Sequence, residues 1–306
     1  MKHRLEYGAV VVVRWFVRLL PDGLVRQLGT LLGLAFFLID RVHRRVAETN
    51  LQTAFPNRSE SDRRAITRAM FVHFGRLLLE LLKFSTLDAD GMRRRIEFTG
   101  REHAESAYAQ GKGVLFVTGH FGYWEIQAIG HALEMHPVGV LARALDNPYL
   151  NTLLEQVRGK TGNFVIYRQG AVRKVLRALG ARQGVAMLID QHMHSPDAIY
   201  VDFFERPAAT TSMLAALALR TGAPVVPVFA LPLPGGRYRL IYEHPVPPPD
   251  PDAPDAIREF TQRCTDVLEM YVRRHPSQWL WMHRRWRDAP VPAATPGMFP
   301  PARAEE

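Results

Sequence analysis

The chain has almost no cysteine: Cys264 is the only one among 306 residues. A single thiol excludes an internal disulfide framework and a metal cluster built on cysteines. Cys264 lies in a segment where apolar residues recur with helical periodicity, so we expect a thiol in the core and not a nucleophile.

Long uncharged apolar runs are also absent. The first apolar segment, residues 7–20, carries Arg14 and Arg18, and the second covers only residues 28–39. Both are shorter than the roughly 18 to 20 uncharged residues that a spanning helix needs, and no small-residue cleavage site of a secretory signal follows them. We predict that residues 1–42 form two amphipathic helices on an anionic membrane surface. Two alternatives stay open: a pair of core helices packed on the main domain, and one tilted spanning helix.

Acidic residues are fewer than basic ones, 30 against 39, which leaves a formal net charge of +9. This excess favours an anionic partner, which could be nucleic acid, acidic lipid or an acidic carrier protein. A cluster near the C-terminus has the aromatic and basic composition of a nucleic-acid patch: Trp279, Trp281, His283, Arg284, Arg285 and Trp286. Tryptophan and arginine there also suit a sheet edge or a membrane interface, and we predict no nucleic-acid partner.

Short apolar runs of strand length alternate with helical segments through most of the chain. The expected strands are residues 114–118, 138–142, 164–167, 185–189 and 225–230, with helices over 125–135, 148–160, 172–179 and 211–221. This alternation predicts an α/β fold with a mostly parallel central sheet flanked by helices. A long amphipathic helix precedes these elements, and a strand over 237–242 and a helix over 255–274 follow them. We assign 43–288 to one α/β domain and predict a disordered Pro/Ala-rich tail over 289–306.

Polar side chains follow four of the expected strands: His120, Arg143, Arg168 and Asp190. Ligands of open α/β sheets bind at the carboxyl ends of the strands, so these residues outline a candidate site. Arg143 and Arg168 can contact phosphate groups of a substrate or pair with acidic side chains. Asn147 is a further candidate substrate contact, although a cap for the following helix is the simpler interpretation.

The strongest single feature is the spacing of His120 and Glu125. Five residues rotate an ideal helix by about 500°, which separates the two side chains and excludes a helical metal pair. A strand-to-helix loop containing Gly119 and Gly122 can instead fold them together. A carboxylate at one ring nitrogen fixes the tautomer and leaves the other nitrogen as a base. Because no serine or cysteine stands beside the pair, it favours direct deprotonation of a substrate hydroxyl.

Seven blocks of the chain resemble, in order, the bacterial lipid A biosynthesis acyltransferase family, the lauroyl and myristoyl transferases of the lysophospholipid acyltransferase superfamily. They are RRVAETNLQTAFPN (44–57), GVLFVTGHFGYWE (113–125), RALDNPYLNTLLEQVR (143–158), MLIDQ (187–191), VDFFERPAATT (201–211), TGAPVVPVF (221–229) and PSQWLWMHRRWR (276–287). The resemblance runs from the N-terminal apolar segment to about Arg287, and it implies a glycerolipid acyltransferase-like fold.

The resemblance also implies an activity: transfer of a fatty acyl chain from a carrier-protein thioester to a hydroxyl of a lipid A precursor or related glycolipid. His120 corresponds to the catalytic histidine and Glu125 to its acidic partner. Arg158 and Asp190 stand at further functional positions, and Arg158 is the candidate for contacting the oxyanion or an anionic substrate group. Glu205 departs from the glycine that members often have, which bears on the local shape of the acyl or acceptor pocket.

We therefore predict an acyltransferase at the cytoplasmic face of the inner membrane, held peripherally or by a single helix. The expected partners are an acyl carrier protein, anionic membrane lipid and the glycolipid acceptor, with acyl-coenzyme A as the alternative donor. No cofactor is expected, and no metal, because His192 and His194 lack a third ligand. Other interpretations are a different glycolipid or lysophospholipid acceptor, a lipid hydrolase or thioesterase, and a non-catalytic membrane-binding protein.

Overall fold

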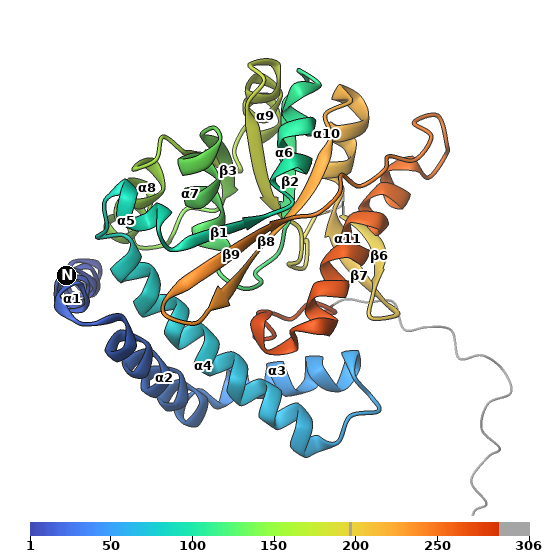
Figure 1. The fold of residues 1–306 in the computed structure, drawn as a ribbon. Coiled ribbons are helices and arrows are strands. Elements are labelled where there is room, and N and C mark those ends of the chain that lie inside the picture. The colour runs from blue at the N-terminus through green and yellow to red at the C-terminus, as the bar shows by residue number, and fades with distance from the viewer. Residues whose placement is uncertain (196–197, 288–306) are drawn as a thin grey trace, which may run out of the picture.

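A seven-stranded sheet forms the centre of the computed structural model, which describes residues 1–195 and 198–287 (Figure 1). Its strands are β1 (Ile96–Thr99), β2 (Val114–Thr118), β3 (Val138–Ala142), β4 (Phe164–Tyr167), β5 (Gly184–Leu188), β8 (Val225–Leu233) and β9 (Arg237–Tyr242). Their order is β1-β9-β8-β2-β5-β3-β4, and every neighbouring pair is parallel except β8 with β9. The predicted α/β class with a mostly parallel sheet is confirmed.

Helices cover both faces of this sheet (Figure 1). They are α5 (Ala89–Arg93), α6 (Arg101–Ala109), α7 (Trp124–Glu134), α8 (Pro148–Gly159), α9 (Ala171–Gly180), α10 (Met213–Thr221), α11 (Ala256–Arg274) and the short η1 (Pro276–Gln278). Successive side chains of a strand point to opposite faces. In β2, Leu115 and Val117 therefore join one buried cluster, while Val114 and Phe116 join a second cluster on the other face. Burial on both faces explains why the strand is a continuous apolar run.

Two parts of this architecture do not follow from the apolar pattern. The edge strand β1 is only four residues long, and Glu97 interrupts its apolar pattern. β6 (Ala198–Phe203) and β7 (Arg206–Thr211) form a separate antiparallel hairpin, with Phe204 and Glu205 in the left-handed backbone region at its turn. Glu205 therefore lies at the tip of a hairpin. The predicted disordered tail, 289–306, lies outside the described residues.

The N-terminal helices pack against the α/β layer and against one another (Figure 1). They are α1 (Lys2–Leu19), α2 (Asp22–Ile39), α3 (Arg41–Ala54) and α4 (Glu60–Phe84). Arg14 of α1, which the sequence suggested for a membrane-facing surface, donates instead to the hydroxyl and carbonyl oxygens of Ser85 at the end of α4. Of the two arginines in the first apolar segment, Arg14 thus forms hydrogen bonds within the protein.

α2 crosses α4 at a contact made by glycines. A Cβ atom added to Gly29 would lie 2.6 Å from the Cα of Arg76, and one added to Gly75 would lie 2.7 Å from the Cα of Gly33. No side chain fits between the two helices at this point, so the backbones themselves are in contact. α2 is thereby fixed to α4.

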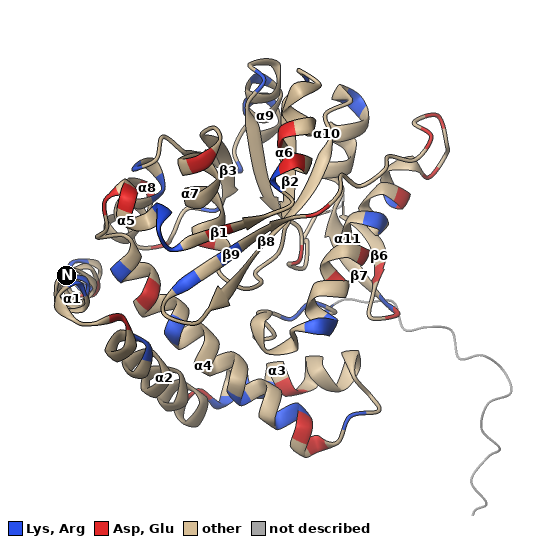
Figure 2. Cartoon of the chain, viewed as in Figure 1, with Lys and Arg blue, Asp and Glu red and all other residues tan. Residues whose placement is uncertain are grey.

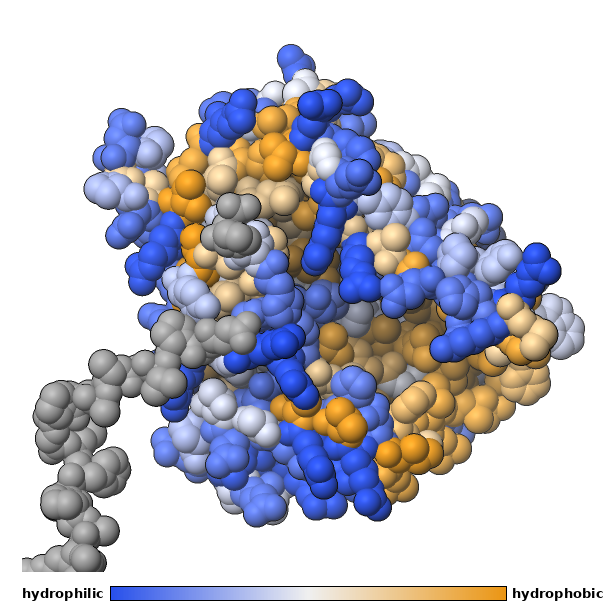
Figure 3. Space-filling view, turned by 180° about the vertical axis from the view of Figure 1, so that it is seen from behind, coloured by the Kyte–Doolittle hydropathy of each residue, from blue (hydrophilic) through white to orange (hydrophobic). Residues whose placement is uncertain are grey.

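The outer surface of α1 and α2 is apolar. Large apolar side chains are exposed along it: Leu5, Val12, Trp15, Phe16, Leu19, Leu24, Leu31, Phe36, Leu38 and Ile39. Figure 3 shows the molecule from behind, so α1 and α2, on the left in Figure 1, lie on the right there. Hydrophobic side chains, in orange, gather at the lower right of that view. Among the described residues, α2 alone is long and apolar enough to cross a membrane, by length and composition only. Membrane association remains a prediction.

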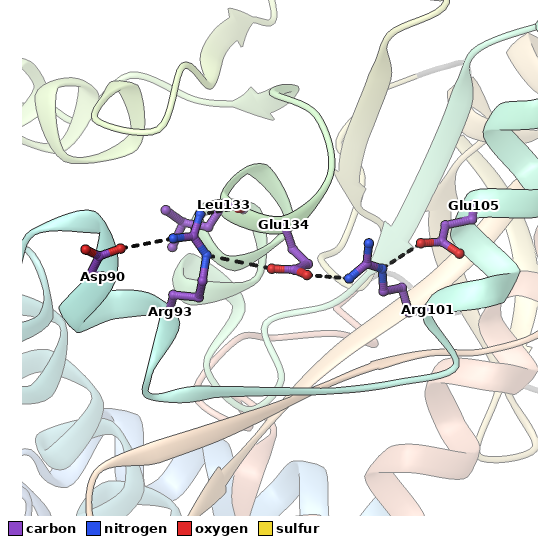
Figure 4. A network of polar contacts seen from close by, with 6 residues as sticks. All are labelled: Asp90, Arg93, Arg101, Glu105, Leu133 and Glu134. Atoms are coloured by element: carbon purple, nitrogen blue, oxygen red, sulfur yellow. Dashed lines mark hydrogen bonds and ion pairs between the residues drawn. The ribbon is translucent and has the colours of Figure 1, made fainter.

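A chain of ion pairs holds the C-terminal end of α7 against α5 and α6 (Figure 4). Glu134 of α7 lies between Arg93 and Arg101 and interacts with both guanidinium groups. Arg93 also donates to the carbonyl oxygen of Leu133 at 2.9 Å, and Arg101 continues the chain to Glu105. Exposed pairs contribute little one at a time, but a network of this kind restrains the helix. The network thus restrains the C-terminal end of α7, while the N-terminal end of the same helix lies beside the candidate site.

We expect the glycine contact to be required for stability. In Gly33→Ala the new methyl group would lie 2.6 Å from the Cα of Val72, so the two helices must separate. Because the clash is with backbone atoms, we expect the cost near the upper end of the about 1 to 3 kcal/mol of overpacking, which exceeds the about 1 kcal/mol that the better helix propensity of alanine returns. The melting temperature should therefore fall, by about 2 to 4 °C for each net kcal/mol.

Gly8→Ala is the matched control, because Gly8 lies in α1 with no atom within 4 Å of an added Cβ. Its melting temperature should stay equal to that of the wild type or rise slightly. Equal melting temperatures for the two variants would show that α2 is not packed on α4 as described.

Candidate active site

The pairing of β2 with β5 brings His120 and Asp190 together. Thr118 lies opposite Leu188 in the parallel register, so the residues two positions further along each strand reach the same level. The Nδ1 atom of His120 lies 2.8 Å from one carboxylate oxygen of Asp190, and the backbone N–H of His120 donates to the other at 2.7 Å. Both strand ends were predicted to carry site residues, and the structure shows that these two are in direct contact.

Asp190 is buried and makes a third hydrogen bond. The indole N–H of Trp279 donates to it at 2.8 Å, from the segment that follows η1. Gly119 leaves room for this carboxyl group, because a Cβ atom at residue 119 would lie 3.0 Å from the Cγ of Asp190. Burial alone would raise the pKa of Asp190. The charge of His120 and the hydrogen bonds from His120 and Trp279 outweigh burial and lower this pKa to about 2.

Asp190 is therefore ionised at neutral pH and accepts the Nδ1–H of His120. The other ring nitrogen, Nε2, lies 3.3 Å from the side-chain amide nitrogen of Gln191 and accepts from it in this tautomer. Burial lowers the pKa of His120, but the charge and hydrogen bond of Asp190, together with the charge of Glu125, raise it above the ordinary value of 6.5. Nε2 is the nitrogen that can take up a proton.

The sequence predicts that Glu125 contacts the imidazole of His120, but in the structure it contacts another side chain. It lies in the first turn of α7, and its carboxylate forms two hydrogen bonds with Arg158 of α8, at 3.0 Å from Nε and 2.6 Å from Nη2. The pair is largely buried, with 15% and 12% of the two side chains exposed. The carboxylate that orients His120 is thus that of Asp190, because the adjacent strand reaches the ring while Glu125 extends towards the next helix. A catalytic role for Glu125 stays a prediction.

A cavity of about 530 Å³ opens beside His120. Its polar lining contains Glu125 and Arg158, and the exposed side chains of Arg143 and Arg168 contribute to the same wall. Most of the remaining lining is apolar: Phe116, Trp124, Ala128, Val138, Val140, Leu141, Leu154, Ala186, Leu188, Met213 and Val228. The structure therefore brings five of the seven predicted site residues to one cavity, with Asp190 behind His120.

Asn147 does not line this cavity. Its side-chain oxygen accepts from the backbone N–H groups of Tyr149 and Leu150, and its amide donates to the carbonyl oxygen of His3 and to Glu6. It caps α8, as the simpler interpretation predicted, and joins that helix to α1.

The C-terminal Trp/Arg cluster is largely interior. Trp279, Trp281 and Arg285 are buried, and Arg285 donates to Gln191 and Ala209 carbonyl oxygens and to the Thr210 hydroxyl. These side chains cannot form a nucleic-acid surface. Trp279 is the functional contact that sequence reasoning missed, since nothing in the spacing of the cluster linked its indole to Asp190.

Two further expectations concern cysteine and metals. Cys264 is buried, as predicted, and burial raises the pKa of its thiol to about 12. Within residues 1–195 and 198–287, no group of three His, Cys, Asp or Glu side chains is arranged to hold a metal ion. That the protein uses no metal remains a prediction.

Comparison with known proteins identifies relatives along nearly the whole chain. The sequence profile of a family described as bacterial lipid A biosynthesis acyltransferase matches residues 2–288. A lipid A biosynthesis lauroyltransferase of Escherichia coli is 28% identical over 280 residues, which are 91% of this chain and 90% of the relative. A lipid A biosynthesis acyltransferase of Haemophilus influenzae is 26% identical over 86% of this chain and 80% of its own length. A lipid A biosynthesis myristoyltransferase of E. coli is 25% identical over 85% and 79%.

The contact between Asp190 and His120 predicts how the pKa of this histidine responds to substitution. In Asp190→Asn the burial that lowers the pKa of His120 remains while the largest opposing contribution is lost, so this pKa should fall below its wild-type value. Glu125→Gln should lower it less, because Asp190 still accepts the Nδ1–H. Titration of the histidine ring signals by NMR, with His120 assigned from His120→Gln, measures the three values. A larger fall in Glu125→Gln than in Asp190→Asn would assign the orienting role to Glu125.

Proposed function

The chain belongs to the bacterial lipid A biosynthesis acyltransferase family and is an acyltransferase, and we propose that it moves a fatty acyl chain from a thioester to a hydroxyl of a lipid A precursor or related glycolipid. The observation that carries the proposal is His120, held at Nδ1 by Asp190 with Nε2 at the wall of a cavity that is apolar along most of its lining. A base at the mouth of an apolar space suits a reaction between a polar hydroxyl and a hydrocarbon chain.

In the proposed reaction His120 acts as the general base. Nε2 takes the proton of the acceptor hydroxyl while its oxygen attacks the thioester carbonyl, and the resulting C–O bond replaces the C–S bond. The proton then passes from the imidazolium to the departing thiolate, so His120 returns to its neutral form. Asp190 is a positioning residue: it fixes the Nδ1–H tautomer and stabilises the imidazolium formed during transfer.

Arg158 is proposed to stabilise the negative charge on the thioester oxygen. It lines the cavity with His120 and is held by two hydrogen bonds to Glu125, so its guanidinium need not reorganise during the reaction. Glu125 then has two effects, fixing Arg158 and raising the pKa of His120. This differs from a His120–Glu125 dyad in which the two side chains touch.

The two exposed arginines at the cavity are proposed to bind phosphate groups of the acceptor. In the part of the chain that the structure describes, the side chain of Arg168 has no partner, and Arg143 pairs only with the exposed Asp146, at 2.7 Å. Guanidinium groups bind phosphate through two parallel hydrogen bonds. The apolar side chains that line the cavity would contact the acyl chain.

An acyl carrier protein is proposed as the donor, with acyl-coenzyme A as the alternative, and the cytoplasmic face of the inner membrane as the place of action. The exposed apolar side chains of α1 and α2 support attachment to a membrane, either by lying on it or through α2. The net charge of +9 supports an acidic carrier.

Loss of the base tests the reaction itself. His120→Ala should reduce acyl transfer by at least the roughly 10²- to 10⁴-fold that a general base contributes. The variant should stay folded at the assay temperature, with a lower melting temperature because the buried Asp190 loses one of its hydrogen-bond donors. Mass spectrometry measures the product, a lipid A precursor heavier by one acyl group, formed by purified enzyme from acyl-carrier donor. His43→Ala, which removes an exposed histidine far along the chain from the site, is the control. Turnover by His120→Ala close to that of the control would refute the mechanism, and release of free fatty acid by the wild type would identify a hydrolase.

Salt separates a carrier-protein donor from other reasons for the basic surface. Attraction between oppositely charged proteins is screened over about 8 Å at physiological ionic strength, so the apparent affinity for acyl-carrier donor should fall steeply as salt is added. Use of a short, soluble thioester should fall much less. Kinetics with both donors across a salt series, at constant detergent and acceptor, provide the comparison. Parallel salt curves would assign the charge to the membrane and acceptor alone.

A further inference from the structure

A second cavity lies between α2, α4 and the segment around η1, and no role has been assigned to it. Its volume is about 500 Å³. Three arginines line it, Arg26 from α2 and Arg68 and Arg76 from α4, together with the hydroxyl-bearing Thr30. Figure 2 shows basic positions spread along α4, on the side of the molecule where the N-terminal helices pack.

The positive charge of this cavity is only partly balanced. Arg26 lies 3.9 Å from Glu80, the one carboxylate that forms an ion pair with any of the three arginines in the described residues. Arg76 is oriented by a hydrogen bond of 2.9 Å from its Nε to Thr30, which leaves its terminal N–H groups for another acceptor. Arg68 is exposed and has no ion pair in the described structure. Guanidinium groups gathered in this way bind phosphate well.

His73 lies in the wall of this cavity, close to two of its arginines. Its side chain is buried in the wall, and its Nε2 donates to the carbonyl oxygen of Gly122 at 3.2 Å. Burial, and then the charges of Arg76 and Arg26, lower its pKa to about 4. His73 is therefore neutral and adds no positive charge of its own.

The apolar surface of α2 continues from the rim of the cavity. Leu34 lines the cavity, and Leu38 follows it one turn later on the same side of the helix with 68% of its surface exposed. Leu31 is exposed beside it. A ligand with a phosphate group and hydrocarbon chains would meet both the arginines and this strip, whereas a free phosphate would use only the arginines.

We propose that this second cavity binds the phosphate group of an anionic phospholipid whose chains lie on the exposed apolar strip of α2. Gln278 and Tyr123 form the inner wall. The loop from His120 to the start of α7 is held there by two backbone hydrogen bonds of 2.9 Å, from Gly122 to Gln278 and from Tyr123 to Ala230. The bound lipid would thus lie directly behind the catalytic loop, apart from the cavity in which acyl transfer is proposed.

The experiment measures binding of the full chain to nanodiscs of phosphatidylglycerol and of phosphatidylcholine at constant ionic strength. Arg68→Gln removes a guanidinium from an exposed position, so the fold should be unchanged, and affinity for phosphatidylglycerol should fall about tenfold, as for loss of a charge-assisted hydrogen bond. Arg64→Gln is the matched control: it removes the same charge one turn earlier on α4, from an exposed residue that does not line the cavity. Its affinity should stay within about twofold of the wild type, as for an unpaired surface charge.

A soluble phosphate ester distinguishes the source of the phosphate. Glycerol 3-phosphate should bind weakly, measured calorimetrically in neutral detergent, and the weak binding should also require Arg68. Tight binding of glycerol 3-phosphate, without preference for phosphatidylglycerol, would overturn the lipid assignment. Equal losses in Arg68→Gln and Arg64→Gln would overturn the site, because general attraction to an anionic surface would then explain all of the binding.

Discussion

The carboxylate of Asp190 is the contact on which the site depends. It is buried, it is ionised, and it accepts hydrogen bonds from the ring and backbone of His120 and from the indole of Trp279. A buried charge is stable only when its partners are complete, so loss of any of these donors leaves an unpaired group that costs several kcal/mol. The strand β5, the loop after β2 and the segment after η1 must therefore all be in place before His120 has its working orientation. The fold and the orientation of the proposed base are thus coupled at one carboxyl group.

The sequence predicts the strands and the residues at their ends, but not the contact between His120 and Asp190. The apolar runs and their turn residues placed β2, β3, β4 and β5 correctly, and the polar residues at their ends include both members of the His120–Asp190 pair. Their contact depends on β2 lying beside β5 in register, with β3 on the far side of β5. Strand order is set by how the helices pack on the two faces, and a linear pattern contains no signal for it. Glu125, the carboxylate nearer to His120 along the chain, was the natural choice for the ring contact, and in the structure it binds Arg158 instead.

The N-terminal helices show a second limit of the same kind. Apolar runs interrupted at Pro21 correctly predict two helices. Which other helices they pack against depends on the shapes of the helix surfaces, which the apolar pattern does not describe. In the sequence, Gly29, Gly33 and Gly75 do not indicate which helices pack together. Their role as contact points is visible only in the structure, where the backbones of α2 and α4 cross at these residues. The apolar side chains that face away from this crossing remain exposed, so packing on α4 and attachment to a membrane are compatible. Of the three interpretations that the sequence left open, packing against the rest of the chain describes the inner faces of these helices, and membrane attachment, on or across the bilayer, stays a prediction for their outer faces.

The basic residues of this chain do not act as one uniform surface. Arg285 donates to carbonyl oxygens in the interior, Arg14 donates to Ser85 at the end of α4, and Arg158 is neutralised by Glu125, so all three use N–H donors within the fold. Other arginines have no such partner among the described residues, and two of these, Arg168 and Arg68, line the two cavities, where concave, low-dielectric walls strengthen their field. The net charge counts all of these groups equally. It therefore overstates how strongly the whole surface attracts anions and understates how strongly the two cavities do. Recognition of anions by this fold is better described by which guanidinium groups keep free N–H donors than by a total of +9.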